Sequence, residues 1–206
     1  MTDRRDFLKL AAATFLVAVA PVVAPGAAHA QAAEKATAFI KSTGERLVAV
    51  VNAPGSAADK RRDIGKIIIG AVDVDAVGRF CLGRFWRQAT PEQQKTYLAL
   101  FQEVLISNIT AKLGEYQGVR FTMGRTRPQD EDQVVSTVVD RPNSAPATVE
   151  WVVTQPAATP RIVDVIAEGT SLRITQRSDY AAYLQRNGNN IDALLAAMKS
   201  QVEANR

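Results

Sequence analysis

Apolar residues in the first part of the chain recur every three or four positions, the spacing that places them on one side of an α-helix. The pattern predicts a first helix over residues 32–51, which ends at Asn52-Ala53-Pro54-Gly55 because proline and glycine interrupt helices. Two shorter helices are predicted over residues 59–70 and 73–86.

The clearest start signal for a helix is Thr90-Pro91-Glu92-Gln93. Thr90 is placed as the N-cap, Pro91 occupies the first helical position, and Gln93 is spaced to reach back as in a capping box. The helix is predicted to run to about residue 113. Its apolar side is formed by Leu98, Phe101, Leu105, Ile109 and Leu113.

After Gly114 the apolar period changes to that of β-strands. Four β-branched runs separated by turn residues predict consecutive antiparallel strands over residues 119–126, 133–140, 147–154 and 161–167. Residues 169–174 either continue or end the sheet. The chain is then expected to close with helices over residues 178–184 and 191–202.

Helices, then a meander of strands, then helices predict an α+β fold. We expect a twisted antiparallel sheet of about four strands, with helices covering one face. In the third strand Val149, Trp151 and Val153 alternate with more polar residues, so these three side chains are expected to face the helices.

The first thirty residues have the features of an export signal. Arg4 and Arg5 precede an apolar stretch over residues 10–23, and Ala28-His29-Ala30 fits a cleavage site after Ala30. Residues 4–9 also resemble a twin-arginine signal, with an ordinary Sec signal as the alternative. We predict an exported protein with a single domain over residues 31–206.

Composition excludes several kinds of chemistry. Cleavage after Ala30 would remove His29, the one histidine, and with it any Ser-His-Asp triad, Cys-His pair or histidine zinc site. The chain has 25 basic and 21 acidic residues, a net charge of +4 that is too mild for a nucleic-acid footprint. We therefore expect no nucleic-acid partner and no metal.

The stretch RFCLGRFWR, residues 79–87, combines arginines and aromatic residues with the one cysteine. Val77, Cys81 and Phe85 are spaced by four residues, so they converge on one side of a helix and the arginines frame a buried stripe. Cys81 has apolar neighbours and no histidine partner, which predicts a small core residue rather than a reactive thiol.

Carboxylates are the remaining candidates for catalysis. A small α+β cone with an inward carboxylate can transfer protons, as ketosteroid-isomerase-like folds do, and Asp164 lies in an otherwise apolar strand. Structural roles explain these acids equally well: Asp73 or Asp75 can cap the third helix, and Asp164 can pair with Arg173 or Arg177. Since no spacing selects one acid as a base, we expect no enzyme.

Two separated stretches resemble the periplasmic phospholipid-shuttle family of the Mla pathway, also called toluene-tolerance proteins. The first stretch runs from Asp73 to Trp86 and continues through Thr90-Pro91-Glu92-Gln93-Gln94 into the helix of Tyr97 and Phe101. The second contains Ile162-Val163-Asp164-Val165, Glu168-Gly169-Thr170-Ser171-Leu172, Arg177 and Tyr180. The resemblance covers about residues 34–200, and the hopanoid-associated branch of the family matches about as well.

The resemblance implies a periplasmic carrier without a cofactor that holds phospholipid acyl chains between the sheet and its helices. Its implied partners are an inner-membrane ABC transporter complex and an outer-membrane lipoprotein and porin assembly, and we expect a monomer. Periodicity alone fits a dry core as well as a lipid cavity. The expected lining residues are Phe80, Phe85, Leu98, Phe101, Leu105, Val149, Trp151, Val153, Val163 and Val165.

Overall fold

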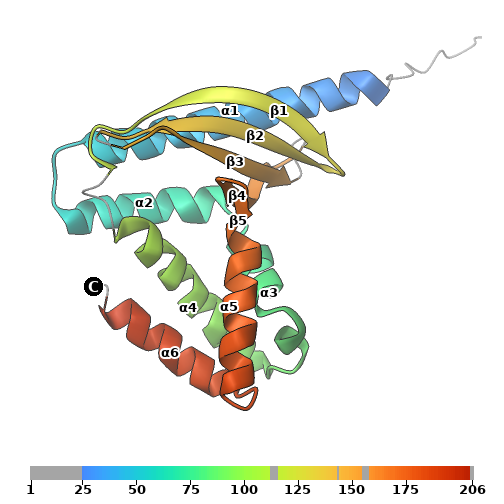
Figure 1. The fold of residues 1–206 in the computed structure, drawn as a ribbon, viewed down its shortest axis with the longest axis vertical. Helices are drawn as coiled ribbons and strands as arrows, with labels where there is room; N and C mark the ends of the chain where they lie inside the picture. Colours follow the sequence, from blue (N-terminus) through green and yellow to red (C-terminus); the bar gives the residue numbers. More distant parts are fainter. Residues whose placement is uncertain (1–24, 112–115, 143, 155–157, 205–206) are drawn as a thin grey trace, which may run out of the picture.

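The computed structural model describes residues 25–111, 116–142, 144–154 and 158–204. Helices precede and follow one antiparallel sheet, which confirms the predicted α+β fold (Figure 1). The helices before the sheet are α1 (Pro25–Asn52), α2 (Ala57–Ala71), α3 (Val74–Leu82), the 3₁₀ helix η1 (Gly83–Arg87) and α4 (Pro91–Thr110). The helices after the sheet are α5 (Leu172–Arg186) and α6 (Ile191–Ala204).

The sheet is a meander with the strand order β1-β2-β3-β4-β5. Its strands are β1 (Arg120–Gln129), β2 (Asp132–Asp140), β3 (Ala147–Thr154), β4 (Arg161–Ala167) and β5 (Thr170–Ser171). The four long strands are those predicted. β1 extends beyond its predicted end at Thr126 because Pro128 lies on an edge strand, where a missing N–H is tolerated, and the turn follows at Asp130 with a φ of 53°.

The predicted capping box at the start of α4 is present. The Gln93 backbone N–H donates to Thr90 Oγ1 at 3.2 Å, and the Thr90 N–H donates to Gln93 Oε1 at 3.0 Å. These bonds satisfy N–H groups that the first turn of a helix leaves unpaired. The predicted end of this helix near Leu113 lies outside the described residues.

Helix α3 is shorter than the predicted span of residues 73–86. Asp73 is its N-cap, since its Oδ1 accepts the Ala76 N–H at 2.9 Å, which confirms one of the two candidate caps. The α-helix ends at Leu82 because Gly83 has a φ of 60°, and the chain continues as η1.

Helix α5 begins at Leu172 rather than at the predicted Ser178. Ser171 caps it, with its Oγ accepting the Ile174 N–H at 3.2 Å. The stretch over residues 169–174 therefore adds only the two residues of β5 to the sheet before the helix starts.

Helices α3 to α6 form a bundle in the half of the molecule away from β1 to β3, with α1 and α2 on the sheet side (Figure 1). The bundle has its own apolar interior, which we call the bundle core. Its buried members are Val74, Cys81, Leu82, Phe85, Ala89, Tyr97, Phe101, Val104, Tyr180, Leu184, Ile191, Leu194, Met198 and Val202.

Strands β2 and β3 are buried on both faces at their middle. Val134 and Val135 are both buried, as are Val152 and Val153. Helix α1 and the end of α2 cover one face, whereas Val77 of α3 packs against the other. The expectation of helices on a single face is wrong for this reason: α3 approaches β4 from the side opposite to α1.

The predicted export signal falls mostly outside the described residues. Residues 25–30, its last part, form the first turns of α1. Among the helices that the structure describes, none combines the length and apolar character needed to cross a membrane.

Candidate functional site

The predicted lining residues from the helices lie together in the bundle. Phe85 and Phe101 belong to the bundle core, and Phe80, Leu98 and Leu105 pack against it. The helical residues that periodicity placed on one side thus lie together in one apolar cluster, and their role as a lining stays a prediction.

The predicted lining residues from the sheet are divided between its two faces. Trp151, Val153 and Val165 lie on the face under α1. Val163 lies on the opposite face. Val149 is half-buried in β3, on the same side of that strand as Trp151. The structure thus places these residues in different apolar clusters from the helical ones.

A bulge in β4 causes this division. Val152 of β3 pairs with Asp164, whereas its neighbour Val153 pairs with Ile162, so Val163 has no partner in the register. An extra residue in one strand shifts the alternation of side chains on either side of it. Val163 consequently points away from α1.

Helix α1 packs onto the sheet through a second apolar cluster, which we call the sheet core. Its buried members are Ala36, Ile40, Ala71, Val135, Val153 and Ile162. Trp151 packs against it, and its indole Nε1–H donates to Thr137 Oγ1 at 2.9 Å. The Thr137 hydroxyl in turn donates to the Val149 carbonyl at 3.2 Å, so this polar pair is satisfied inside an apolar region.

Val72 and Leu105 connect the apolar clusters. A third cluster, the α2 core, contains Val51, Ile64, Ile68, Ile106 and Val119. Val72 packs against the bundle core, the sheet core and the α2 core, and Leu105 packs against the bundle core and the α2 core. The apolar interior is therefore continuous from the contact between α1 and the sheet to the helix bundle.

The junction at Val72 is fixed to β4. The Asp73 N–H donates to the Ile162 carbonyl at 3.0 Å. Arg161 Nη1 donates to the carbonyls of Ile69 and Gly70 at 3.3 and 2.6 Å, at the end of α2, where a cation is favoured by the helix dipole. The end of α2 is thus attached to the sheet by polar contacts.

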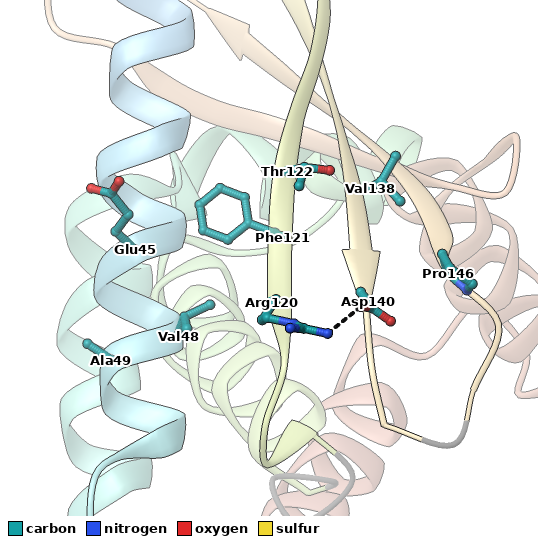
Figure 2. Close-up of a pocket in the computed structure, with 9 residues that line it drawn as sticks. All are labelled: Glu45, Val48, Ala49, Arg120, Phe121, Thr122, Val138, Asp140 and Pro146. Carbon is teal, nitrogen blue, oxygen red and sulfur yellow. Dashed lines mark hydrogen bonds and ion pairs between the residues drawn. The ribbon is translucent and has the colours of Figure 1, made fainter.

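A surface groove of about 730 Å³ lies beside α1 at the open edge of β1 (Figure 2). Apolar side chains dominate its walls. Arg120 of β1 and Asp140 of β2, which are register partners, form an ion pair of 3.1 Å at one end of it (Figure 2). The lining residues are Glu45, Val48, Ala49, Arg120, Phe121, Thr122, Val138, Asp140 and Pro146.

Polar contacts hold α1 against β1 and against the residues just before it, on both sides of this groove. The hydroxyls of Thr37 and Thr126 lie 2.7 Å apart and share a hydrogen bond. Toward the end of α1, Asn52 Oδ1 accepts the Gly118 N–H at 2.8 Å. Between these contacts, α1 and β1 meet through side-chain packing.

Phe121 fills the space between the two contacts. Its ring points toward α1 (Figure 2), and three of its atoms lie 2.6 to 3.0 Å from the position that a Cβ on Gly44 would take. Only glycine permits this approach, because a real Cβ is essentially never so close to another atom. Phe121 therefore lines the groove and closes α1 onto β1 at the same time.

Gln133 is a buried polar residue at the edge of the sheet core. Its side chain is only 3% exposed, and its Oε1 has no hydrogen-bond partner among the described residues. It pairs across the sheet with Val153, a member of the sheet core. A buried acceptor without a partner is costly and is commonly explained by a bound ligand or water.

Both carboxylate oxygens of Asp164 accept hydrogen bonds from neighbouring residues. Its Oδ1 accepts the N–H groups of Val165 and Arg173 at 2.8 and 3.2 Å, and its Oδ2 accepts the Ser171 hydroxyl at 2.6 Å. Arg173 Nε completes the set with an ion pair of 3.3 Å. The expected pairing with an arginine is confirmed, and the carboxylate joins β4 to the start of α5.

Cys81 is a core residue, as predicted. It is 1% exposed, and its Sγ donates to the Arg173 carbonyl at 3.6 Å. Burial raises the pKa of the thiol to about 12 and also raises the pKa values of the Tyr97 and Tyr180 hydroxyls. Across the described part of the chain, no three His, Cys, Asp or Glu side chains come together in a way that could hold a metal ion.

Sequence reasoning did not single out Gly44, Phe121, Gln133 or Val72. Two of them carried a signal: a glycine inside a helical pattern costs about 1 kcal/mol relative to alanine and suggests close packing, and a glutamine inside a β-branched run suggests a buried polar group. Neither signal identifies the opposing residue, since that depends on how α1 is placed on the sheet.

The helices and the sheet thus enclose an apolar interior that is continuous through Val72 and Leu105, which defines the chain as an α+β protein with one connected core. The chain belongs to the MlaC protein family, which it matches over residues 41–200.

Two known proteins illustrate this relationship. The chain is 24% identical over 141 residues to the toluene tolerance protein ttg2D of Pseudomonas putida, a match that covers 68% of this chain and 66% of that protein, just under two thirds of its length. It also shares the fold of a phospholipid-binding protein from Ralstonia solanacearum solved in complex with a phospholipid. That comparison has a TM-score of 0.73 at 21% identity and covers 82% of this chain and 98% of the other.

Proposed function

We propose that the protein is a phospholipid carrier that holds acyl chains between α1 and the sheet. The observation that supports this is the apolar interior that continues through Val72 and Leu105. Between the polar contacts at Thr37 and Asn52, α1 meets β1 through side-chain packing, which an acyl chain can replace with contacts of the same kind.

The energetics of a lipid in water require such an interior. A two-chain lipid has on the order of thirty methylenes, and exposing them at about 0.8 kcal/mol each would cost on the order of 25 kcal/mol. The interior of a carrier must therefore hold acyl chains about as favourably as a bilayer does. It need not hold them more favourably, because transfer is driven only by the difference in free energy between the lipid in the carrier and the lipid in the acceptor membrane.

The proposed path starts at the groove and passes Phe121. Trp151, Val153 and Val165 line it under α1, with Val149 beside them. It continues past Leu105 toward the remaining bundle residues of the predicted set, Phe80, Phe85, Leu98 and Phe101. Val163 would contact the cargo only where a chain reached the opposite face of β4.

We further propose that the carrier acts in the periplasm as a monomer, after export by the signal at residues 1–30. Phospholipid would be its cargo, without a cofactor or a catalytic step. Its partners would be an inner-membrane ABC transporter complex and an outer-membrane lipoprotein and porin assembly. A hopanoid-associated lipid is the alternative cargo, supported by the equal match of the sequence motifs to that branch.

Mass spectrometry of lipids extracted from protein purified without detergent tests the proposal. We expect phospholipid in the wild type and much less in Phe121→Glu, which places a charge in the path. Ile109→Glu is the matched control, because Ile109 is exposed on α4 and lies outside the groove. An extract without lipid, or an equal loss in both variants, would overturn the proposal, and an extract of hopanoid alone would favour the alternative cargo.

A further inference from the structure

A cationic surface lies on the bundle, where α3, η1 and α5 meet. These three elements carry six arginines, no lysine and two aspartates. Five of the arginines are exposed, and one of these, Arg186, lies at the far end of α5. The other four exposed arginines are Arg79, Arg84, Arg87 and Arg177. We call this set the arginine face.

Aromatic rings hold three of these arginines in place. The guanidinium carbon of Arg79 lies 5.2 Å from the Trp86 ring centroid, and that of Arg84 lies 4.9 Å from the Phe85 centroid. Arg177 lies 4.9 Å from the centroid of a third ring, that of Phe80. Because stacking limits the rotamers of a guanidinium, less conformational entropy remains to be lost when it binds.

The arginine face is continuous across two helices. Arg177 of α5 lies over Phe80 of α3, and its Nε is 3.2 Å from the position that a Cβ on Gly83 would take. Gly83 thus lets α5 place a cation directly against the junction of α3 and η1.

The described part of the chain provides no salt-bridge partner for the arginine face. Among the described residues, none of its four arginines forms an ion pair. Arg173, which also lies over Phe80, differs because it pairs with Asp164. The four remaining guanidinium groups are available to an anionic partner.

Two aliphatic side chains extend from the same region. Leu172 and Ile174, on either side of Arg173 in the first turn of α5, are 50% and 55% exposed, the highest values among the exposed large hydrophobic residues of the described chain. They stand on different sides of the helix, so they do not form the single apolar centre that a protein interface usually buries.

We propose that the arginine face, with Leu172 and Ile174, binds the surface of an anionic phospholipid bilayer. Guanidinium groups bind lipid phosphates. Because Leu172 and Ile174 stand on different sides of α5, one of the two enters the interfacial region between head groups together with the arginines. This rests on the proposed function, since a lipid carrier has reason to approach a bilayer. Contacts of this kind are weak and reversible, which suits a carrier that must leave again.

Vesicle co-sedimentation of the full chain tests the proposal. The vesicles contain phosphatidylcholine alone or an equal mixture of phosphatidylcholine and phosphatidylglycerol. We expect binding to the mixture only, reduced by about fivefold for each arginine removed in the variant Arg79→Gln/Arg84→Gln/Arg87→Gln. A control variant, Lys41→Gln/Arg125→Gln/Lys199→Gln, removes the same charge from exposed positions on α1, β1 and α6.

A second variant and a parallel lipid extraction separate the outcomes. Leu172→Ser/Ile174→Ser should weaken binding to the mixture without changing the charge. Equal loss in the control variant, or equal binding to both kinds of vesicle, would overturn the proposal. Soluble polyglutamate provides a further comparison. If the protein bound polyglutamate as tightly as the mixed vesicles, and Leu172→Ser/Ile174→Ser did not weaken that binding, the proposal would also be overturned in favour of an acidic protein partner. Wild-type protein that carries extracted phospholipid but binds no vesicles would refute this docking surface while leaving the carrier function intact.

Discussion

Substituting alanine at Gly44 perturbs the contact that closes α1 onto β1. The new Cβ would lie 2.6 Å from Phe121 Cζ and 2.9 and 3.0 Å from the two adjacent ring carbons. The ring must therefore move, and the groove on its other side offers the space. The substitution tests whether this contact exists without removing any apolar group.

Two opposing effects set the size of the change. Alanine is better than glycine in a helix interior by about 1 kcal/mol. Overpacking typically costs about 1–3 kcal/mol, and the displaced ring also loses part of its packing against α1. We expect Gly44→Ala to lower the free energy of unfolding by about 1 kcal/mol, as the difference of these effects.

In a Phe121→Ala background the clash is absent, so the same substitution should raise the free energy of unfolding by about 1 kcal/mol. The double-mutant cycle then gives a coupling of about 2 kcal/mol between the two positions. Urea unfolding of the four delipidated proteins measures it. Equal stabilisation by Gly44→Ala in both backgrounds would refute the close contact between α1 and β1.

Three further substitutions or treatments test other parts of the site. Gln133→Leu should stabilise the lipid-free protein by about 1 kcal/mol in urea unfolding, since it removes a buried acceptor without a hydrogen-bond partner. A loss of stability would mean that the Gln133 amide does have a hydrogen-bond partner. Asp164→Asn should destabilise the protein by about 2–4 kcal/mol because it breaks a buried ion pair with Arg173, and an unchanged unfolding midpoint would contradict that role. The pKa of the Cys81 thiol is raised from 9.0 to about 12, so this thiol should resist iodoacetamide at pH 8 until the protein unfolds. The thiol ionises at a lower pH in the unfolded chain than in the folded protein, so the free energy of unfolding should fall as the pH rises from 9 toward 12. Rapid labelling of the native protein, or a stability that is constant over this pH range, would contradict its burial.

Local signals in the sequence predicted the elements well. The capping box at Thr90 and the β-branched runs depend on residues close together in the chain, and both appear in the structure where they were predicted. The start of α5 was missed because residues 169–174 were all expected to continue or end the sheet, although serine before a helical run is also a good N-cap. Ser171 has both roles in the structure, since it ends β5 and caps α5, and its hydroxyl also donates to Asp164 Oδ2.

The placement of side chains over long distances was not predictable in the same way. Alternation correctly placed Trp151 and Val153 under α1, but the bulge in β4 put Val163 on the other face. Bulges depend on the partner strand, which the sequence of β4 alone does not reveal. The contact between Gly44 and Phe121 likewise depends on how α1 lies across the sheet, so periodicity could not identify it.

A disulfide between α1 and β1 offers the most direct test of where the cargo sits. The hydroxyl oxygens of Thr37 and Thr126 are 2.7 Å apart, near enough for Thr37→Cys and Thr126→Cys to form a bond. Cys81 is buried and should not interfere. Thr37→Ser/Thr126→Ser serves as the control that cannot be cross-linked.

The decisive measurement is the rate of phospholipid transfer from loaded protein to acceptor vesicles, before and after reduction of this disulfide. If cargo leaves between α1 and the sheet, transfer should be slow in the oxidised protein and return to the rate of the serine control on reduction. Equal transfer by the oxidised and reduced proteins would show that lipid passes elsewhere and would contradict the proposed location.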